Sequence, residues 1–139
     1  MMPRSEGAVS TTTTNAAIVR RLMEEVWGRG RSELVAALVA DAYVGHLAIG
    51  DHYGPEGVRI EVATYRTAFP DLMVTVDDLR AVDDRVVRRF TLRGRQLGSF
   101  LNIPSSGRSV VLRGMAIDRL ALGQLVESWV HVDVLPLLG

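Results

Sequence analysis

The chain has 139 residues, enough for one domain with a substantial buried core, and its 47% hydrophobic and 23% charged residues are ordinary for a soluble globular protein. The 16 basic and 16 acidic residues cancel, so the charge indicates neither nucleic acid nor an anionic membrane as a partner. No apolar run approaches the ~20 residues that span a bilayer and no signal peptide is recognisable, so we expect a cytoplasmic protein.

Two residue types are missing, and each absence excludes a mechanism. Because there is no Cys, thiol nucleophiles, disulfides and thiolate metal sites are excluded. All 16 basic residues are Arg, so no lysine amine can form a Schiff base with a carbonyl substrate.

The N-terminal region is predicted to be a flexible tail followed by a helix. Residues 1–13 are mostly small and polar, which favours a loose tail, and residues 14–139 are predicted to form a single domain. Thr14 or Asn15 would cap a helix whose apolar residues recur at helical spacing until Gly28 ends it.

Two further helices are predicted before the chain becomes extended. A short helix starts at Ser32, and the segment 41–44 after it is extended. The third helix has Pro55 in its first turn and ends at Pro70. Its apolar positions are Val58, Val62, Tyr65 and Phe69.

After Pro70 the hydrophobic period changes to two, which is typical of strands. Strands are predicted over 72–76, 85–97, 109–119 and 127–133. Helices followed by a run of strands predict an α+β fold in which three N-terminal helices pack on a curved antiparallel sheet around an internal pocket.

The last strand carries an unusual set of side chains on alternate positions. They are Glu127, Trp129, His131 and Asp133, which share one face because strand side chains alternate with period two. A two-residue turn at 122–123 would pair this face with the small residues Gly114 and Ala116, leaving room for a ligand. We therefore expect this face to line the pocket.

Several motifs resemble the SnoaL-like polyketide cyclase family, a branch of the nuclear transport factor 2-like fold, across residues 15–139. They are Gly54-Pro55-Glu56-Gly57-Val58, Ala68-Phe69-Pro70-Asp71, Leu92-Arg93-Gly94, Ile103-Pro104, Gly123 and Glu127-x-Trp129-x-x-x-Asp133. The resemblance implies a cone-shaped α+β barrel with a deep pocket. It also implies a homodimer or homotetramer built on the outer sheet face, and polycyclic aromatic polyketide substrates of the kind found in anthracycline antibiotic biosynthesis.

The resemblance also bears on the reaction. Ring-closing cyclases of the family use an Asp and a His at positions that align with Val130 and Ala116, neither of which can move a proton. The chain is therefore more similar to the hydroxylase branch, which implies no bound flavin or metal, molecular oxygen as co-substrate and a separate nicotinamide-dependent reductase. Intramolecular aldol cyclisation is the second reading, and a non-catalytic small-molecule binding module is the third.

Four residues are the main candidates for the site. Asp133 would move a proton on a phenol or enol, with His131 or His46 orienting it and Trp129 as a stacking wall. The structural alternatives are a strand-end cap for Asp133 and a core histidine for His46.

Three more residues are candidates for substrate binding. If the register of the last strand is inverted, Arg113 and Met115 enter the pocket and His131 leaves it. Phe69 is by default a core residue of the third helix and is a further substrate-binding candidate. The spacing of His46 and His52 matches no metal motif, so no metal site is expected.

Overall fold

The structure is a computed structural model that describes residues 4–139, with side chains from residue 11 onward. The helices are α1 (Arg4–Arg21), α2 (Val35–Leu38) and α3 (Gly54–Ala68), with a π-helical turn η1 (Leu22–Trp27) and 3-10 turns η2 (Ser32–Leu34) and η3 (Leu135–Leu137). The strands are β1 (Val39–Leu47), β2 (Gly50–Tyr53), β3 (Met73–Val82), β4 (Arg85–Arg95), β5 (Ser109–Ala121) and β6 (Gln124–Val132). The α+β class is confirmed.

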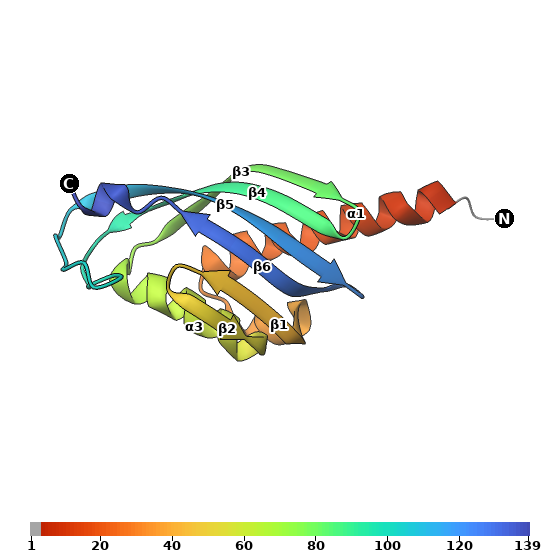
Figure 1. Ribbon diagram of the computed structural model, residues 1–139, viewed down its shortest axis with the longest axis horizontal. Helices are drawn as coiled ribbons and strands as arrows, with labels where there is room; N and C mark the ends of the chain where they lie inside the picture. Colours follow the sequence, from red (N-terminus) through yellow and green to blue (C-terminus); the bar gives the residue numbers. More distant parts are fainter. Residues whose placement is uncertain (1–3) are drawn as a thin grey trace.

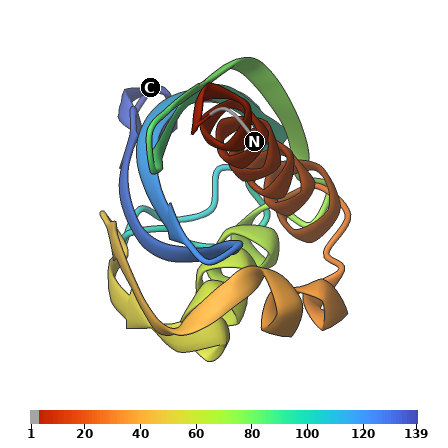
Figure 2. The same ribbon diagram turned by 90° about the vertical axis from the view of Figure 1, so that its right-hand side faces the viewer.

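All six strands form one sheet in the order β2-β1-β6-β5-β4-β3 (Figure 1). Every neighbouring pair is antiparallel except β1 and β6, which run parallel, so the prediction of a purely antiparallel sheet is wrong at this pair. β1 precedes the meander β3–β6 in the chain and joins the sheet beside its last strand, β6. Figure 2 shows the sheet curving around α1, with α3 closing the lower side.

The first helix is longer than predicted. It begins at Arg4, so the loose tail over residues 1–13 is wrong from that point on, while residues 1–3 lie outside the described residues. Asn15, predicted as a possible cap, is 4% exposed inside the helix. Adding residues to an existing helix costs less than nucleating one, so the buried part of α1 can extend toward the N-terminus. In Figure 1 this extension projects beyond the sheet.

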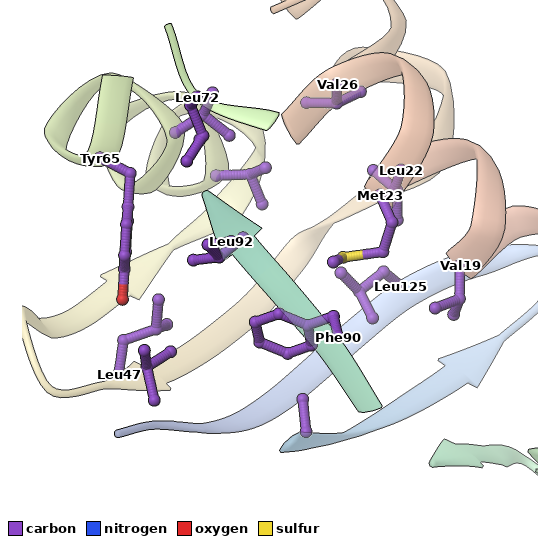
Figure 3. Packing of buried hydrophobic residues seen from close by; sticks show 14 of the residues in the cluster. Val19, Leu22, Met23, Val26, Leu47, Tyr65, Leu72, Phe90, Leu92 and Leu125 are labelled. Atoms are coloured by element: carbon purple, nitrogen blue, oxygen red, sulfur yellow. The ribbon is translucent and has the colours of Figure 1, made fainter. Parts of the chain in front are cut away.

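The predicted second and third helices are confirmed. Val35 and Leu38 are buried in α2, and α3 buries Val58, Val62 and Tyr65 against the sheet. Figure 3 shows Met23 reaching from η1 toward the sheet and Tyr65 reaching from α3 toward Leu47. Helices and sheet thus share one core. No helix in residues 4–139 is long and apolar enough to cross a membrane.

The β5–β6 hairpin has a register shift that inverts one predicted face. Next to the turn, Ala121 pairs with Gln124, but beyond an irregularity between Arg119 and Leu120 the pairing is offset by one residue, and Arg119 pairs with Glu127. A one-residue slip moves every side chain of a strand to the other face. The prediction that the acidic and aromatic face of β6 lines the interior is therefore wrong.

The inner face of the sheet carries a buried ion pair in place of those residues. Arg88 on β4 donates from Nε to Asp118 Oδ2 at 2.7 Å and from Nη2 to Asp118 Oδ1 at 3.2 Å. Ser128 on β6 donates its hydroxyl to Asp118 Oδ1 at 2.7 Å, and Arg88 Nη1 lies 2.8 Å from Met23 Sδ. A buried charge pair is tolerable when hydrogen bonds satisfy both partners, as they do here.

Removing one partner of this pair should destabilise the protein. We expect Asp118→Ala to lower the free energy of unfolding by about 3–5 kcal/mol, because Arg88 would remain charged and buried without its acceptor. Urea denaturation measures this change. Asp78→Ala, which removes an exposed aspartate, serves as the control and should shift the midpoint little. Equal shifts in the two variants would show that the buried pair contributes nothing particular.

Candidate functional site

Most of the sequence-predicted site residues lie on the outer face of the sheet. On β6 the inward side chains are Ser128, Val130 and Val132, whereas Trp129 and His131 point outward. Met115 pairs directly with His131, and direct partners share a face, so it points outward as well. Neither register considered from the sequence is observed, because His131 and Met115 leave the interior together.

The structure nevertheless brings four of these residues together. An open groove on the outer face is lined by His46, Met115, Trp129 and His131 with Val87, Ile117 and the edges of Ala116 and Val130. Trp129 stacks on His46 with ring centroids 5.8 Å apart, and the Arg85 guanidinium lies 5.4 Å from the indole centroid. The predicted stacking wall therefore exists outside the barrel.

His46 is held between two carboxylates at one side of this groove. Its Nε2 lies 2.8 Å from Glu127 Oε2, and its Nδ1 lies 3.3 Å from Asp51 Oδ1. The hydrogen bond to Glu127 raises the pKa of His46, and Asp51 adds to this effect. Reciprocally, the hydrogen bond with His46 lowers the pKa of Glu127, helped by Arg119. His46 is thus neither an apolar core residue nor part of the interior.

The remaining three candidates lie away from any shared site. Asp133 is exposed and its Oδ1 accepts a hydrogen bond from the backbone N–H of Leu135 at 3.0 Å, which is the geometry of a strand-end cap. Arg113 is exposed on the outer face of β5. Phe69 is 1% exposed and packs against Phe100 with centroids 5.7 Å apart, as its position on the helix predicts for a core residue.

The interior holds two small adjoining cavities between the helices and the sheet. One, of about 20 Å³, is lined by Val19, Leu22, Met23, Trp27, Tyr43, Val58, Glu61, Arg88, Asp118, Leu125 and Ser128. The other, of about 10 Å³, is lined by Met23, Trp27, Leu47, Tyr65, Arg88, Phe90, Leu92, Val130 and Val132. Met23, Trp27 and Arg88 line both cavities. A volume of this size holds about one water, so these side chains occupy the space expected for a deep pocket.

Glu61 is a buried carboxyl of the first cavity that has a single side-chain hydrogen-bond donor among the described residues. It projects from α3, is 3% exposed, and its Oε2 accepts a hydrogen bond from the Tyr43 hydroxyl of β1 at 2.8 Å. Gly45 makes this contact possible, because a Cβ there would clash with both the Tyr43 hydroxyl and Glu61 Oε2. The Glu61 carboxyl therefore lies against β1 at Gly45, where the strand has no side chain.

The surroundings of Glu61 favour its neutral form. Burial raises the pKa of Glu61 to about 7, although the Tyr43 hydrogen bond and the Arg88 guanidinium oppose this effect and Asp118 adds to it. Burial also raises the pKa of Tyr43, and the Glu61 charge reinforces this, so the phenol stays protonated and acts as a donor. A carboxyl that titrates near neutral pH inside a cavity is suited to taking up and returning protons.

The sequence interpretation missed Glu61, although a signal was present. Glu61 lies three residues after Val58 and four before Tyr65, both predicted on the buried face of the third helix. A carboxylate within an apolar helical stripe needs a partner or a function, since burying it unpaired is costly.

A six-stranded sheet that curves around helices matches the nuclear transport factor 2-like cone fold. The family model described as SnoaL-like polyketide cyclase matches residues 17–139. The chain therefore belongs to the SnoaL-like polyketide cyclase family.

Solved structures agree with this assignment. A candidate SnoaL-like polyketide cyclase from Jannaschia sp. CCS1 is 28% identical, with a TM-score of 0.83 over 92% of this chain and 91% of that one. IdmH, a candidate polyketide cyclase from Streptomyces antibioticus, is 25% identical, with a TM-score of 0.76 over 89% and 95% of the two chains. AclR, a candidate hydroxylase from Streptomyces galilaeus, shares the fold at 23% identity, with a TM-score of 0.77 over 91% and 94%. No curated protein sequence matches the chain.

The protonation of Glu61 should be visible in the pH dependence of stability. The unfolded chain releases this proton near its ordinary value of 4.5, whereas the folded protein holds it up to about 7. The folded state thus binds more protons between these values, so stability falls as pH rises through this range, by about 3 kcal/mol in all. Glu61→Gln should remove this component.

Urea denaturation at pH 5 and pH 8 tests this expectation. The matched control is Glu56→Gln, which changes an exposed glutamate of the same helix and should leave the wild-type pH dependence in place. If Glu61→Gln and wild type lose the same stability between the two pH values, the carboxyl is not held neutral by burial.

Proposed function

We propose that the protein is a tailoring enzyme of aromatic polyketide metabolism in which Glu61 takes up a proton from a phenol or enol of a polycyclic, anthracycline-type substrate. The observation that carries this proposal is the buried Glu61 carboxyl, hydrogen-bonded to Tyr43 and exposed to an internal cavity. Family membership and likeness to the candidate polyketide cyclases support the substrate class.

The residues around Glu61 suit this chemistry. Removing a phenolic or enolic proton leaves an electron-rich anion, which a nearby guanidinium stabilises best where water is excluded. Arg88 lines the cavity and donates from Nη1 only to the sulfur of Met23, a weak acceptor that a substrate oxygen would readily replace. Glu61 would act as the base and Arg88 would stabilise the resulting anion.

Substrate access requires a change in the cavity wall. Pockets for drug-sized ligands measure roughly 300–1,000 Å³, far more than the two cavities provide. Met23 and Trp27, which fill the space, belong to the π-helical turn η1, and π-helical turns occur frequently at functional sites. Displacement of η1 from the sheet would join the cavities and admit a flat polycyclic ring.

Hydroxylation is the preferred reaction. The resemblance aligns Val130 and Ala116 with the cyclase acid/base pair, and neither side chain can move a proton. The two residues are direct partners across β6 and β5. In hydroxylation one atom of O₂ enters the substrate and the other leaves as water, which takes two electrons and two protons. No flavin or metal is called for in this proposal, and a separate nicotinamide-dependent reductase would supply the electrons.

Aldol ring closure is the second candidate. It needs only proton transfer, and the likeness to two candidate polyketide cyclases favours it. The assignment of proton transfer to Asp133, with His131 or His46 orienting it, remains an alternative that the same experiment tests.

Conversion of an anthracycline-type substrate should depend on Glu61. With O₂ and a nicotinamide-dependent reductase supplied, we expect Glu61→Gln to lower kcat by on the order of 10²-fold or more with little change in KM, because the variant keeps the shape of the side chain and loses its titration. Product formation is followed by mass spectrometry.

Two comparisons make this experiment specific. Glu56→Gln should retain wild-type turnover, and Asp133→Asn should do so as well if that residue only caps the strand end. Loss of turnover in Asp133→Asn with full activity in Glu61→Gln would move the base to Asp133. Binding without conversion by wild type would favour a non-catalytic carrier.

The outer sheet face is the proposed site of self-association. Val87, Ile117 and Trp129 lie in one cross-strand row over β4, β5 and β6, and each is 37–40% exposed. Helices bury the inner face of this sheet, while its outer face carries a contiguous apolar row. Covering that row would remove apolar surface from water, and a second copy of the chain presents the same surface. The proposed assembly is a homodimer, or a homotetramer made from two such pairs.

Sedimentation at micromolar concentration should therefore show no monomer for the wild type. Ile117→Arg places a charge in the middle of the row and should shift the protein to monomer. Leu122→Arg, at the fully exposed turn between β5 and β6, is the matched control and should remain associated. A monomeric wild-type protein would contradict the assembly.

A further inference from the structure

His52 on β2 is the strongest feature of the interior that the proposed function leaves unused. Its Nδ1 is buried and has no hydrogen-bond partner among the described residues, while Glu61 Oε2 lies 4.0 Å away. An unsatisfied buried nitrogen costs free energy unless it serves a purpose. We propose that His52 conducts the proton between Glu61 and solvent, an inference that rests on the proposed role of Glu61 as the base.

The position of His52 fits a connection between the cavity and the surface. β2 is the edge strand of the sheet, and the His52 side chain is 15% exposed whereas that of Glu61 is 3% exposed. The side chain is therefore partly open to solvent, while its buried Nδ1 lies 4.0 Å from the Glu61 carboxyl. A small rotation of either side chain would shorten the 4.0 Å separation to a hydrogen bond.

Two glycines allow the ring to occupy this place. Gly45 lies directly opposite His52 across β1 and β2, and its missing side chain makes room for the Tyr43 hydroxyl and Glu61 Oε2, so the carboxyl can lie close to this strand pair. Gly57 on α3 lets the helix approach β2 closely, because a Cβ there would lie 2.9 Å from the His52 carbonyl carbon and 3.1 Å from its Cβ. Gly45 thus makes room for the Glu61 carboxyl, and Gly57 makes room for His52 beside α3.

The other charged or titratable groups near Glu61 do not offer this route. Tyr43 of β1 donates to the same carboxylate oxygen, and burial raises its pKa, so it holds its proton. Arg88 of β4 and Asp118 of β5 are engaged with each other, and burial raises the pKa of Tyr65 of α3 to about 12. Among the described residues around Glu61, His52 is the one that brings a buried ring nitrogen without a hydrogen-bond partner to within 4.0 Å of the carboxyl.

The proton transfer balances without any co-reactant other than water. Glu61 takes a proton from the substrate and becomes neutral, and His52 Nδ1 then accepts that proton, which restores the carboxylate. The imidazolium releases the proton on Nε2 to water, leaving the neutral ring in the other tautomer. The reverse order delivers a proton to the product, and a ring flip resets the tautomer.

A test that does not depend on turnover is a rapid pH jump from 5 to 8 followed by infrared spectroscopy. The C=O stretch of protonated Glu61 is identified by its absence in Glu61→Gln, and its decay measures proton exit. We expect the decay to slow at least tenfold in His52→Phe, which keeps a flat ring without nitrogens, and to recover when imidazole is added. Tyr53→Phe, a change to the exposed aromatic residue beside His52 on β2, is the control and should decay at the wild-type rate.

The outcomes separate the relay from the proposed function. Turnover of His52→Phe in weak buffer should fall at least tenfold and rise with imidazole, a rescue that a purely structural role would not show. A wild-type infrared decay rate in a folded His52→Phe protein overturns the relay, as does a slowed decay that imidazole leaves unchanged. Failure of wild type to convert any substrate overturns the proposed function, while the infrared decay still decides the relay.

Discussion

The register shift in the β5–β6 hairpin decides what the interior of this protein contains. Because the shift lies next to the turn, at Arg119 and Leu120, it acts on the whole remaining length of β6. Ser128, Val130 and Val132 therefore meet the core, and the residues between them meet the exterior. This offset places Ser128 inside, beside Asp118. It also places Trp129 outside, where it stacks on His46 and joins the exposed apolar row.

Inside the barrel, the buried polar groups form two hydrogen-bonded sets. One is Asp118 with Arg88 and Ser128, and the other is Glu61 with Tyr43. Asp118, which is 1% exposed, accepts two hydrogen bonds from Arg88 and one from Ser128. Glu61, with only the Tyr43 hydroxyl as a donor, is held closer to neutrality. The two buried carboxyls that line one cavity thus differ in their hydrogen-bond donors, and Glu61, with a single hydroxyl donor, is the one suited to exchanging protons.

The outer face uses a similar set of residue types for a different purpose. Trp129, His46 and Glu127 form a stacked and hydrogen-bonded group that solvent still reaches, so its electrostatics are screened and its apolar surface is available to another molecule. Interior chemistry and outer association therefore occupy opposite faces of the same strands. From Glu127 to Val132, a substitution on β6 will affect the outer face at odd-numbered positions and the interior at even-numbered positions.

Local pattern in the sequence determined the α+β class, the third helix with its Pro55 start and its stop before Pro70, and the four strands after Pro70, because each depends on periodicity or turn residues within a few positions. Strand β2 was not predicted, and β1 was predicted only as an extended segment over 41–44. It also placed Gly114 and Ala116 correctly on the inner face of β5. Which side chains of β6 point into the interior could not be predicted, because this depends on the bulge in the β5–β6 pair. A bulge is a property of two paired strands, so no single segment of sequence reveals it. Glu61, Tyr43 and His52 come from α3, β1 and β2, and they meet only because Gly45 and Gly57 allow close approach in the folded chain. Only the tertiary structure brings these three residues together, because the neighbours of the buried Glu61 carboxyl are distant from it in sequence.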